Sequence, residues 1–211
     1  MVMISENSTA DPFPRESVSP GNYFDLAQNA DVFETTAAFE EWSVNLSADS
    51  GPERIEGVPV SGAFFDLVAA VPADGRLLAA ADDVPGRDKV AVISYGLWQR
   101  RFGGAANIVG QPIRLDGEPY SIVGIAPSTL KFPFDSDVWV PHALSEKDRE
   151  NRGDHYLTML ARRRPGVTFD QAAGQIETLY QRIKQQHPDA TRSRDAVVRT
   201  LTQGMVDFGL P

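Results

Sequence analysis

Residues 90–104 read VAVISYGLWQRRFGG, residues 107–127 read NIVGQPIRLDGEPYSIVGIAP, and residues 137–141 read DVWVP. The first block predicts a buried strand followed by a short helix. The second predicts two strands joined by a tight turn, and the third predicts one more strand. This part of the chain is therefore expected to form a β-rich unit with a single helix.

The ends of the short helix and the tight turn are both marked by residue type. Ser94 is a typical N-cap, and Gly103 stands where a left-handed C-terminal residue is favoured. The pair Asp116-Gly117 is typical of a type I′ hairpin turn, because that turn needs positive φ at both positions. Trp98 is expected to be buried between the helix and its sheet, and a ligand-stacking face with Tyr95 and Phe102 is the alternative.

The two ends of the chain show a different pattern, in which strands alternate with amphipathic helices. Ser19-Pro20 is typical of a helix start. Thr168 and Gln171 form a capping-box pattern at the start of a longer helix, which Pro188 is expected to end. The remaining expected elements are strands at 2–5, 35–46, 54–60, 156–161 and 196–198, a short helix at 63–68, and a polar loop at 6–17.

These patterns predict an α+β fold with two subdomains. Residues 1–74 and 146–211 are expected to form a βαβ subdomain from both chain ends. Residues 75–145 are expected to form an inserted β-rich subdomain. Under this division, Val2–Val60 and Tyr156–Val198 share one core.

The composition restricts the function classes. The 211 residues carry a net charge of −9, which argues against nucleic acid and anionic lipid as partners. The chain has no cysteine, so disulfides and thiolate metal sites are excluded. No segment is apolar enough to span a membrane, and no signal peptide is visible. The chain is expected to be either cytosolic or an extracytoplasmic piece whose export signal lies elsewhere.

No residue pattern assembles a catalytic, cofactor or metal site, so none is predicted. The histidines lie far apart and lack ligand spacing. The acidic pairs match no calcium loop, and they are expected to be solvated loop charges. The glycines follow a helix instead of opening one, so they indicate helix termination and not a phosphate loop. The weighed candidates are His142, His155 and His187, Asp82-Asp83, Asp135 and Asp137, Gly103-Gly104 with Gly110, and the solvated or salt-bridged Arg162-Arg163-Arg164.

Several blocks resemble the MacB-like periplasmic core domain of MacB/FtsX-type ABC transporter permeases, in the duplicated acidobacterial form. The most specific are residues 94–104 and 109–127. Similar stretches occur at 2–6, 19–25, 32–34, 60–66 and 161–168. Ala69 departs from the usual glycine, and Arg163-Arg164 departs from the usual Leu-Lys.

The resemblance implies that the subdomain formed by both chain ends is porter-like. It also implies a non-enzymatic extracytoplasmic domain on the periplasmic side of the inner membrane. It would relay ATP-driven motion of permease membrane helices, absent from this chain, to a periplasmic adaptor or an exported drug, peptide or lipoprotein. A cytoplasmic ATPase subunit is the implied energy source. No cofactor is implied, and the isolated domain is expected to be monomeric.

Two rivals stay open at this point. The first is a free-standing extracytoplasmic domain that binds a peptide or a lipid, which predicts a deep apolar pocket. The second is a hydrolase that uses Asp135, Asp137 and His155, which predicts a carboxylate and an imidazole within hydrogen-bond reach.

Overall fold

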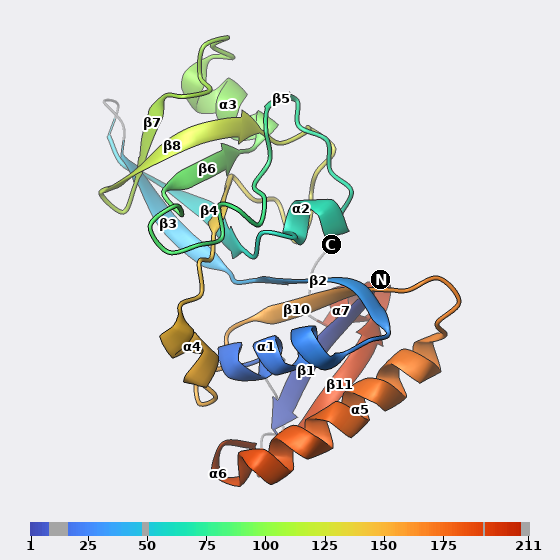
Figure 1. Cartoon of the computed structure of the whole chain (residues 1–211). Coiled ribbons are helices and arrows are strands. Elements are labelled where there is room, and N and C mark those ends of the chain that lie inside the picture. Colours follow the sequence, from blue (N-terminus) through green and yellow to red (C-terminus); the bar gives the residue numbers. More distant parts are fainter. Residues whose placement is uncertain (9–16, 48–50, 192, 208–211) are drawn as a thin grey trace. The chain divides into compact units, whose positions relative to one another are not determined.

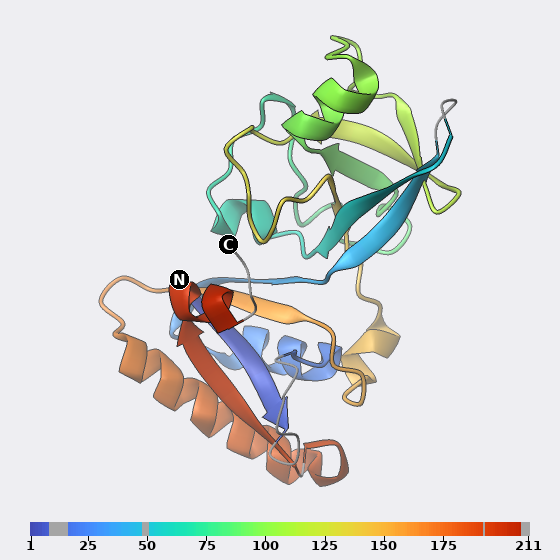
Figure 2. The same ribbon diagram turned by 180° about the vertical axis from the view of Figure 1, so that it is seen from behind.

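A computed structural model describes residues 1–8, 17–47, 51–191 and 193–207. The chain divides into two compact units, which are shown in Figure 1 and from behind in Figure 2. Unit 1 contains residues 1–38 and 144–211, and unit 2 contains residues 39–143. Each unit has its own hydrophobic core, so the fold is α+β with an inserted β-rich unit.

Unit 1 is a sheet with α1 and α5 packed on one face and α7 on the other. The strands lie in the order β11-β1-β10-β2, and β1 is antiparallel to both of its neighbours. The elements of this unit are β1 (Val2–Ser8), α1 (Pro20–Asn29), β2 (Phe33–Phe39, which runs into unit 2 at its last residue), α4 (Glu146–Glu150), β10 (Thr158–Arg163), α5 (Phe169–Gln186), α6 (Pro188–Thr191), β11 (Arg194–Thr200) and α7 (Leu201–Asp207).

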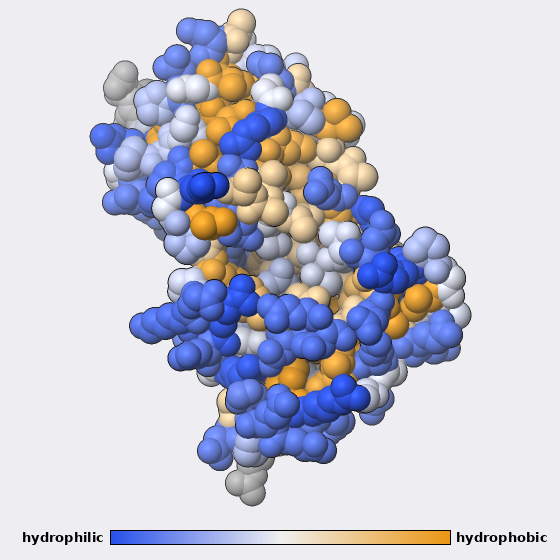
Figure 3. All heavy atoms as spheres, in the orientation of Figure 1, coloured by the Kyte–Doolittle hydropathy of each residue, from blue (hydrophilic) through white to orange (hydrophobic). Residues whose placement is uncertain are grey.

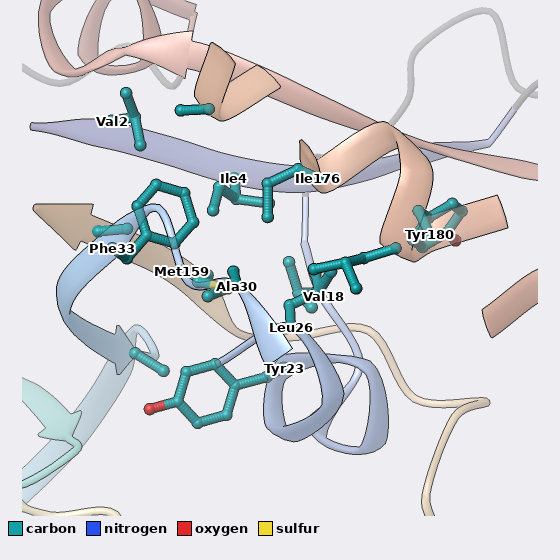
Figure 4. Close-up of a cluster of buried hydrophobic side chains, with 14 of the residues drawn as sticks. Val2, Ile4, Val18, Tyr23, Leu26, Ala30, Phe33, Met159, Ile176 and Tyr180 are labelled. Carbon is teal, nitrogen blue, oxygen red and sulfur yellow. The ribbon is translucent and has the colours of Figure 1, made fainter. Parts of the chain in front are cut away.

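The core of unit 1 is formed by one face of the sheet and by the apolar faces of α1 and α5. Val2 and Ile4 point to the same side of β1, because successive side chains of a strand alternate. Leu26 of α1 and Ile176 of α5 pack against them, as Figure 4 shows. The predicted capping box of α5 is present, with Gln171 N donating to Thr168 Oγ1 and Thr168 N donating to Gln171 Oε1.

Unit 2 is a six-stranded barrel. The strands follow one another as β4-β3-β7-β8-β6-β9, and parallel pairing of β4 with β9 closes the ring. Closure leaves no exposed edge among these strands. The elements of this unit are β3 (Trp42–Ser47), β4 (Glu53–Val60), α2 (Phe64–Leu67), β5 (Asp74–Gly75), β6 (Val90–Ile93), α3 (Tyr95–Phe102), β7 (Pro112–Leu115), β8 (Glu118–Ile125) and β9 (Val138–Pro141).

The structure corrects the expected boundary between the subdomains. The first division lies between residues 38 and 39 and not between 74 and 75, and the second lies between 143 and 144. The reason is that β3 and β4 belong to the barrel, where β3 pairs with β7 and β4 pairs with β9. Residues 39–60 were expected to share the core of unit 1, but they belong to unit 2.

The short helix and the hairpin form as predicted. Ser94 Oγ accepts a hydrogen bond from Leu97 N at 2.9 Å, and Gly103 ends α3 with a φ of 61°. Asp116 and Gly117 have φ values of 46° and 84°, as a type I′ turn requires. Trp98, however, is only half-buried, and Leu97 is the buried residue of α3.

Candidate functional site

The most heavily bonded buried carboxylate in unit 1 is that of Glu6. It lies on the same side of β1 as Val2 and Ile4, toward α1 and α5, and its exposed fraction is 0%. A buried carboxylate is stable only when other groups donate hydrogen bonds to it or compensate its charge. The surroundings of Glu6 supply such hydrogen bonds.

Two elements that follow Glu6 in the sequence provide the first donors. Asn22 Nδ2 of α1 lies 3.0 Å from each carboxylate oxygen. The backbone N–H of Ser19, just before α1, donates to Oε1 at 3.3 Å. The Ser19-Pro20 helix start therefore places two donors over the carboxylate of Glu6.

The other two donors come from the C-terminal part of the chain. Tyr180 OH of α5 donates to Glu6 Oε2 at 3.0 Å, and His155 Nε2 lies 3.1 Å from the same oxygen. The other ring nitrogen of His155 lies 2.9 Å from the carbonyl oxygen of Gly153. Both ring nitrogens of His155 therefore lie within hydrogen-bond distance of an oxygen atom. His155 thus ties the segment before β10 to the carboxylate of Glu6.

A second layer of contacts holds these donors in place. Arg152 donates to Asn22 Oδ1 and pairs with Asp25 at 2.7 Å. Burial raises the pKa of Tyr180, and the negative charge of Glu6 raises it further. Tyr180 therefore stays protonated and can keep donating to Glu6. We call Glu6, Asn22, His155 and Tyr180 the Glu6 network.

The Glu6 network connects elements and does not have the form of a catalytic site. Both carboxylate oxygens accept bonds from protein donors, and the network is enclosed by the core of unit 1. What it does is fasten β1 to α1, to α5 and to the segment 151–157, which precedes β10. This role was missed because a polar loop was expected at 6–17. The alternation of side chains that begins with Val2 and Ile4 could have predicted that Glu6 points inward.

The three histidines do not come together. His142 Nε2 lies 3.0 Å from Glu40 Oε2 in unit 2, whereas His155 belongs to the Glu6 network in unit 1. His187 is the C-cap residue of α5. Among the described residues, no group of three histidine, aspartate or glutamate side chains could hold a metal ion.

The acidic pair Asp82-Asp83 is not solvated, which corrects the expectation. Asp82 accepts two bonds from Arg76 and one from Ala79 N, and its pKa is lowered chiefly by the hydrogen bonds from Arg76. Asp83 accepts from the backbone N–H groups of Gly62 and Ala143. Both carboxylates therefore fasten loops of unit 2.

The remaining acidic candidates also have structural partners. Asp135 pairs with Lys131 at 2.5 Å, and Asp137 pairs with Arg100 at 3.2 Å. Both lie in unit 2, whereas His155 lies in unit 1 and contacts Glu6. The contacts of these residues thus offer no support for the hydrolase alternative.

The arginine and aromatic candidates are explained by local contacts. Arg163 donates to the carbonyl oxygen of Val167, and Arg164 donates to that of Asp31. Trp98 Nε1 donates to Ala105 O at 3.0 Å, and its ring lies edge-on to Tyr95. The three bonds are made within the chain, so none of them indicates a ligand.

Surface character differs along the chain. In Figure 3 the surface over α1 and α5 is mostly hydrophilic, with apolar atoms visible between the helices. Within the described residues, no helix combines the length and the apolar character needed to cross a membrane.

Comparison with known proteins identifies the class. Residues 1–179 match the family model of the MacB-like periplasmic core domain. The chain belongs to this family, whose members are the periplasmic domains of MacB/FtsX-like ABC transporter permeases. This confirms the resemblance noted in the sequence. No curated protein gives a significant match.

Solved structures share the fold. A permease domain from Porphyromonas gingivalis superposes with a TM-score of 0.73 at 15% identity, covering 95% of this chain and 90% of that one. The periplasmic region of MacB from Actinobacillus actinomycetemcomitans gives 0.70 at 13% identity, covering 98% and 92%. The extracellular domain of the noncanonic ABC-type transporter YknZ from Gram-positive bacteria gives 0.67 at 14% identity, covering 92% and 99%.

Proposed function

We propose that this domain is a non-enzymatic relay on the periplasmic side of the inner membrane. ATP-driven motion of permease membrane helices enters the domain and is passed to extracytoplasmic partners or to the exported substrate. The energy source is a cytoplasmic ATPase subunit. A periplasmic adaptor, a drug, a peptide or a lipoprotein remain the candidate recipients.

The observation that carries this proposal is the pairing of β1 with β11. The two strands are antiparallel over seven residue pairs, from Val2 opposite Thr200 to Ser8 opposite Arg194. Strands from opposite parts of the sequence therefore share one ladder. A displacement applied at the Val2–Thr200 end acts on both strands together.

The Glu6 network supplies a route out of this ladder. Glu6 on β1 contacts His155 in the segment between α4 and β10. The chain reaches that segment from unit 2, which ends at residue 143, through residues 144–150, which include α4. A displacement of β1 is thus transmitted through Glu6 to the connection between the units.

Reconstitution tests the relay in the intact permease with its ATPase. Glu6→Gln replaces one carboxylate oxygen of Glu6 by an amide nitrogen but nearly keeps the side-chain shape. We expect ATP hydrolysis to continue while ATP-driven export, or the response of the extracytoplasmic partner, falls. Glu56→Gln is the matched control, because Glu56 lies in unit 2, is exposed, and accepts hydrogen bonds from the Ser43 hydroxyl at the surface.

The outcome that contradicts the relay is undiminished export by a Glu6→Gln permease whose His155 contact is shown by NMR to be broken. If Glu6→Gln does not fold, His155→Gln provides the same test from the other side of the contact.

For the isolated chain, we expect no turnover of ATP or of ester and peptide substrates, with or without divalent metals. Turnover that disappears in His155→Ala or Asp137→Asn would indicate an enzyme instead.

A further inference from the structure

The sheet of unit 1 has an open edge. β11 stands at the end of the strand order and pairs with β1 on one side. Within the described parts of the chain, no strand pairs with its other side. The backbone N–H and C=O groups on such an edge can accept an additional strand.

A groove runs between this edge strand and α5. It has a volume of about 380 Å³ and is lined by one face of α5, from Asp170 to Gln181, and by Asp195, Ala196 and Val198 of β11. Figures 1 and 2 both show α5 alongside β11. Ala173 and Gly174 lie in the middle of the helical wall, and their small side chains leave room for an occupant.

The groove is acidic. Asp170, Glu177 and Asp195 line it, and no lysine or arginine does. Lys184 pairs with Asp195 at 2.7 Å. Asp170 and Glu177 are exposed and form no ion pair within the described residues. Two uncompensated carboxylates therefore face the space beside β11.

A second groove continues the first toward α7. Val198 lines both grooves. The second is also lined by the apolar Phe169 and Val206 and by the polar Arg199, Thr202 and Gln203. Val206 has an exposed fraction of 70%, which is high for an apolar side chain. The combined surface thus offers an acidic part beside the first half of β11 and, beside its end, a mixed part whose apolar side chains are Phe169, Val198 and Val206.

We propose that β11 and α5 bind an extended peptide segment. Every second residue of this segment is basic or apolar, and the residues between them are neither. The segment adds to the open edge of β11 by backbone pairing, which is a common mode of peptide recognition. Alternate residues of a strand lie about 7 Å apart on one face. Asp170 and Glu177, seven positions apart on a helix, are separated by about 10 Å, which two lysines on alternate positions can bridge.

This inference goes beyond the relay, because it concerns a surface that the isolated domain presents. It names the chemistry of one partner, a basic extended segment. Its failure would leave the relay untouched, since the relay is tested in the assembled permease and this surface is tested on the isolated chain.

Peptide titration tests the proposal. The probes are Lys-Thr-Lys-Thr-Val and its reverse sequence, added to the isotope-labelled chain and followed by NMR. We expect one of the two orders to shift the amide signals of β11 and of the Asp170–Gln181 face. Glu177→Gln should weaken binding two- to fivefold, which is the range for one exposed ion pair.

Two controls make the outcome decisive. Gln185→Lys also raises the net charge by about one unit on the exposed surface of α5 but lies outside the groove, so it should leave affinity within a factor of about two. A peptide with N-methylated amides cannot donate to β11 and should lose binding. Binding that survives N-methylation, equal effects of the two variants, or no shifts on β11 would each overturn the proposal.

Discussion

Glu6 Oε2 and His155 Nε2 lie 3.1 Å apart, although 149 positions separate the two residues in the chain. The side chain of Glu6 is 0% exposed and that of His155 is 8% exposed, so water screens the contact very little. This contact joins the first strand of the described chain to the segment that returns from unit 2. Both the stability of unit 1 and its proposed relay role depend on it.

Loss of the Glu6 carboxylate should destabilise unit 1 strongly. Glu6→Ala leaves Asn22, Tyr180 and His155 buried without their shared acceptor. Breaking a buried charged network in this way costs about 3–5 kcal/mol. Urea unfolding of the isolated chain measures the cost. Glu56→Ala, an exposed carboxylate, should stay within about 0.5 kcal/mol, and an equal effect of the two variants would refute the network.

Tyr180 should make the domain sensitive to alkali. Its pKa is raised from the model-compound value of 10.0 by burial and by the charge of Glu6. A group with a raised pKa contributes stability that is fully present below its unfolded pKa. That contribution is lost as the pH rises above about 10 toward the folded pKa, because only the unfolded state then releases the proton.

The check is a series of melting temperatures between neutral and strongly alkaline pH. Tyr180→Phe should melt lower at neutral pH, because the Glu6 bond is gone, and should show a smaller further loss above about pH 10. Identical alkaline slopes for the two proteins would show that Tyr180 is not the responsible group.

The hairpin turn should tolerate only residues that accept positive φ. Gly117 has a φ of 84°, and an added Cβ would meet no atom within 4 Å, so strain there comes from the backbone alone. Gly117→Val should cost on the order of 1 kcal/mol or more, whereas Gly117→Asn should cost clearly less. Thermal melting compares them, and equal melting temperatures would argue against this turn.

Leu97, and not Trp98, should be the residue of α3 on which the core of unit 2 depends. Leu97 is 0% exposed and packs among the barrel residues. Leu97→Ala should therefore cost about 2–5 kcal/mol. Val109, which is 37% exposed, provides a comparison, and Val109→Ala should cost less than about 1 kcal/mol. A small effect at Leu97 would show that α3 is not anchored in this way.

Local patterns predicted local structure well. The Ser94 cap, the Asp116-Gly117 turn and the Thr168–Gln171 capping box each depend on residues within a few positions of one another, and each is present. Such features are decided by backbone geometry and by side chains that bond nearby amides.

Features decided by distant pairing were missed. Barrel closure depends on Gly57 meeting Val138 and Val60 meeting Pro141, and nothing near β4 signals that partner. The expected boundary at 74/75 was wrong for this reason. Glu6 was taken for a loop residue because a charged side chain inside a core makes sense only once Tyr180 and His155 are known to reach it.

The central claim is that nucleotide-driven motion passes through this domain, and a distance measurement tests it most directly. The chain has no native cysteine, so Thr178→Cys in unit 1 and Asn107→Cys in unit 2 can carry spin labels at defined positions. In the reconstituted permease, the relay predicts that the distance distribution between the two labels changes when ATP binds to the partner ATPase, and that Glu6→Gln reduces the change. The same distribution with and without ATP, in a permease that still exports its substrate, would contradict the relay.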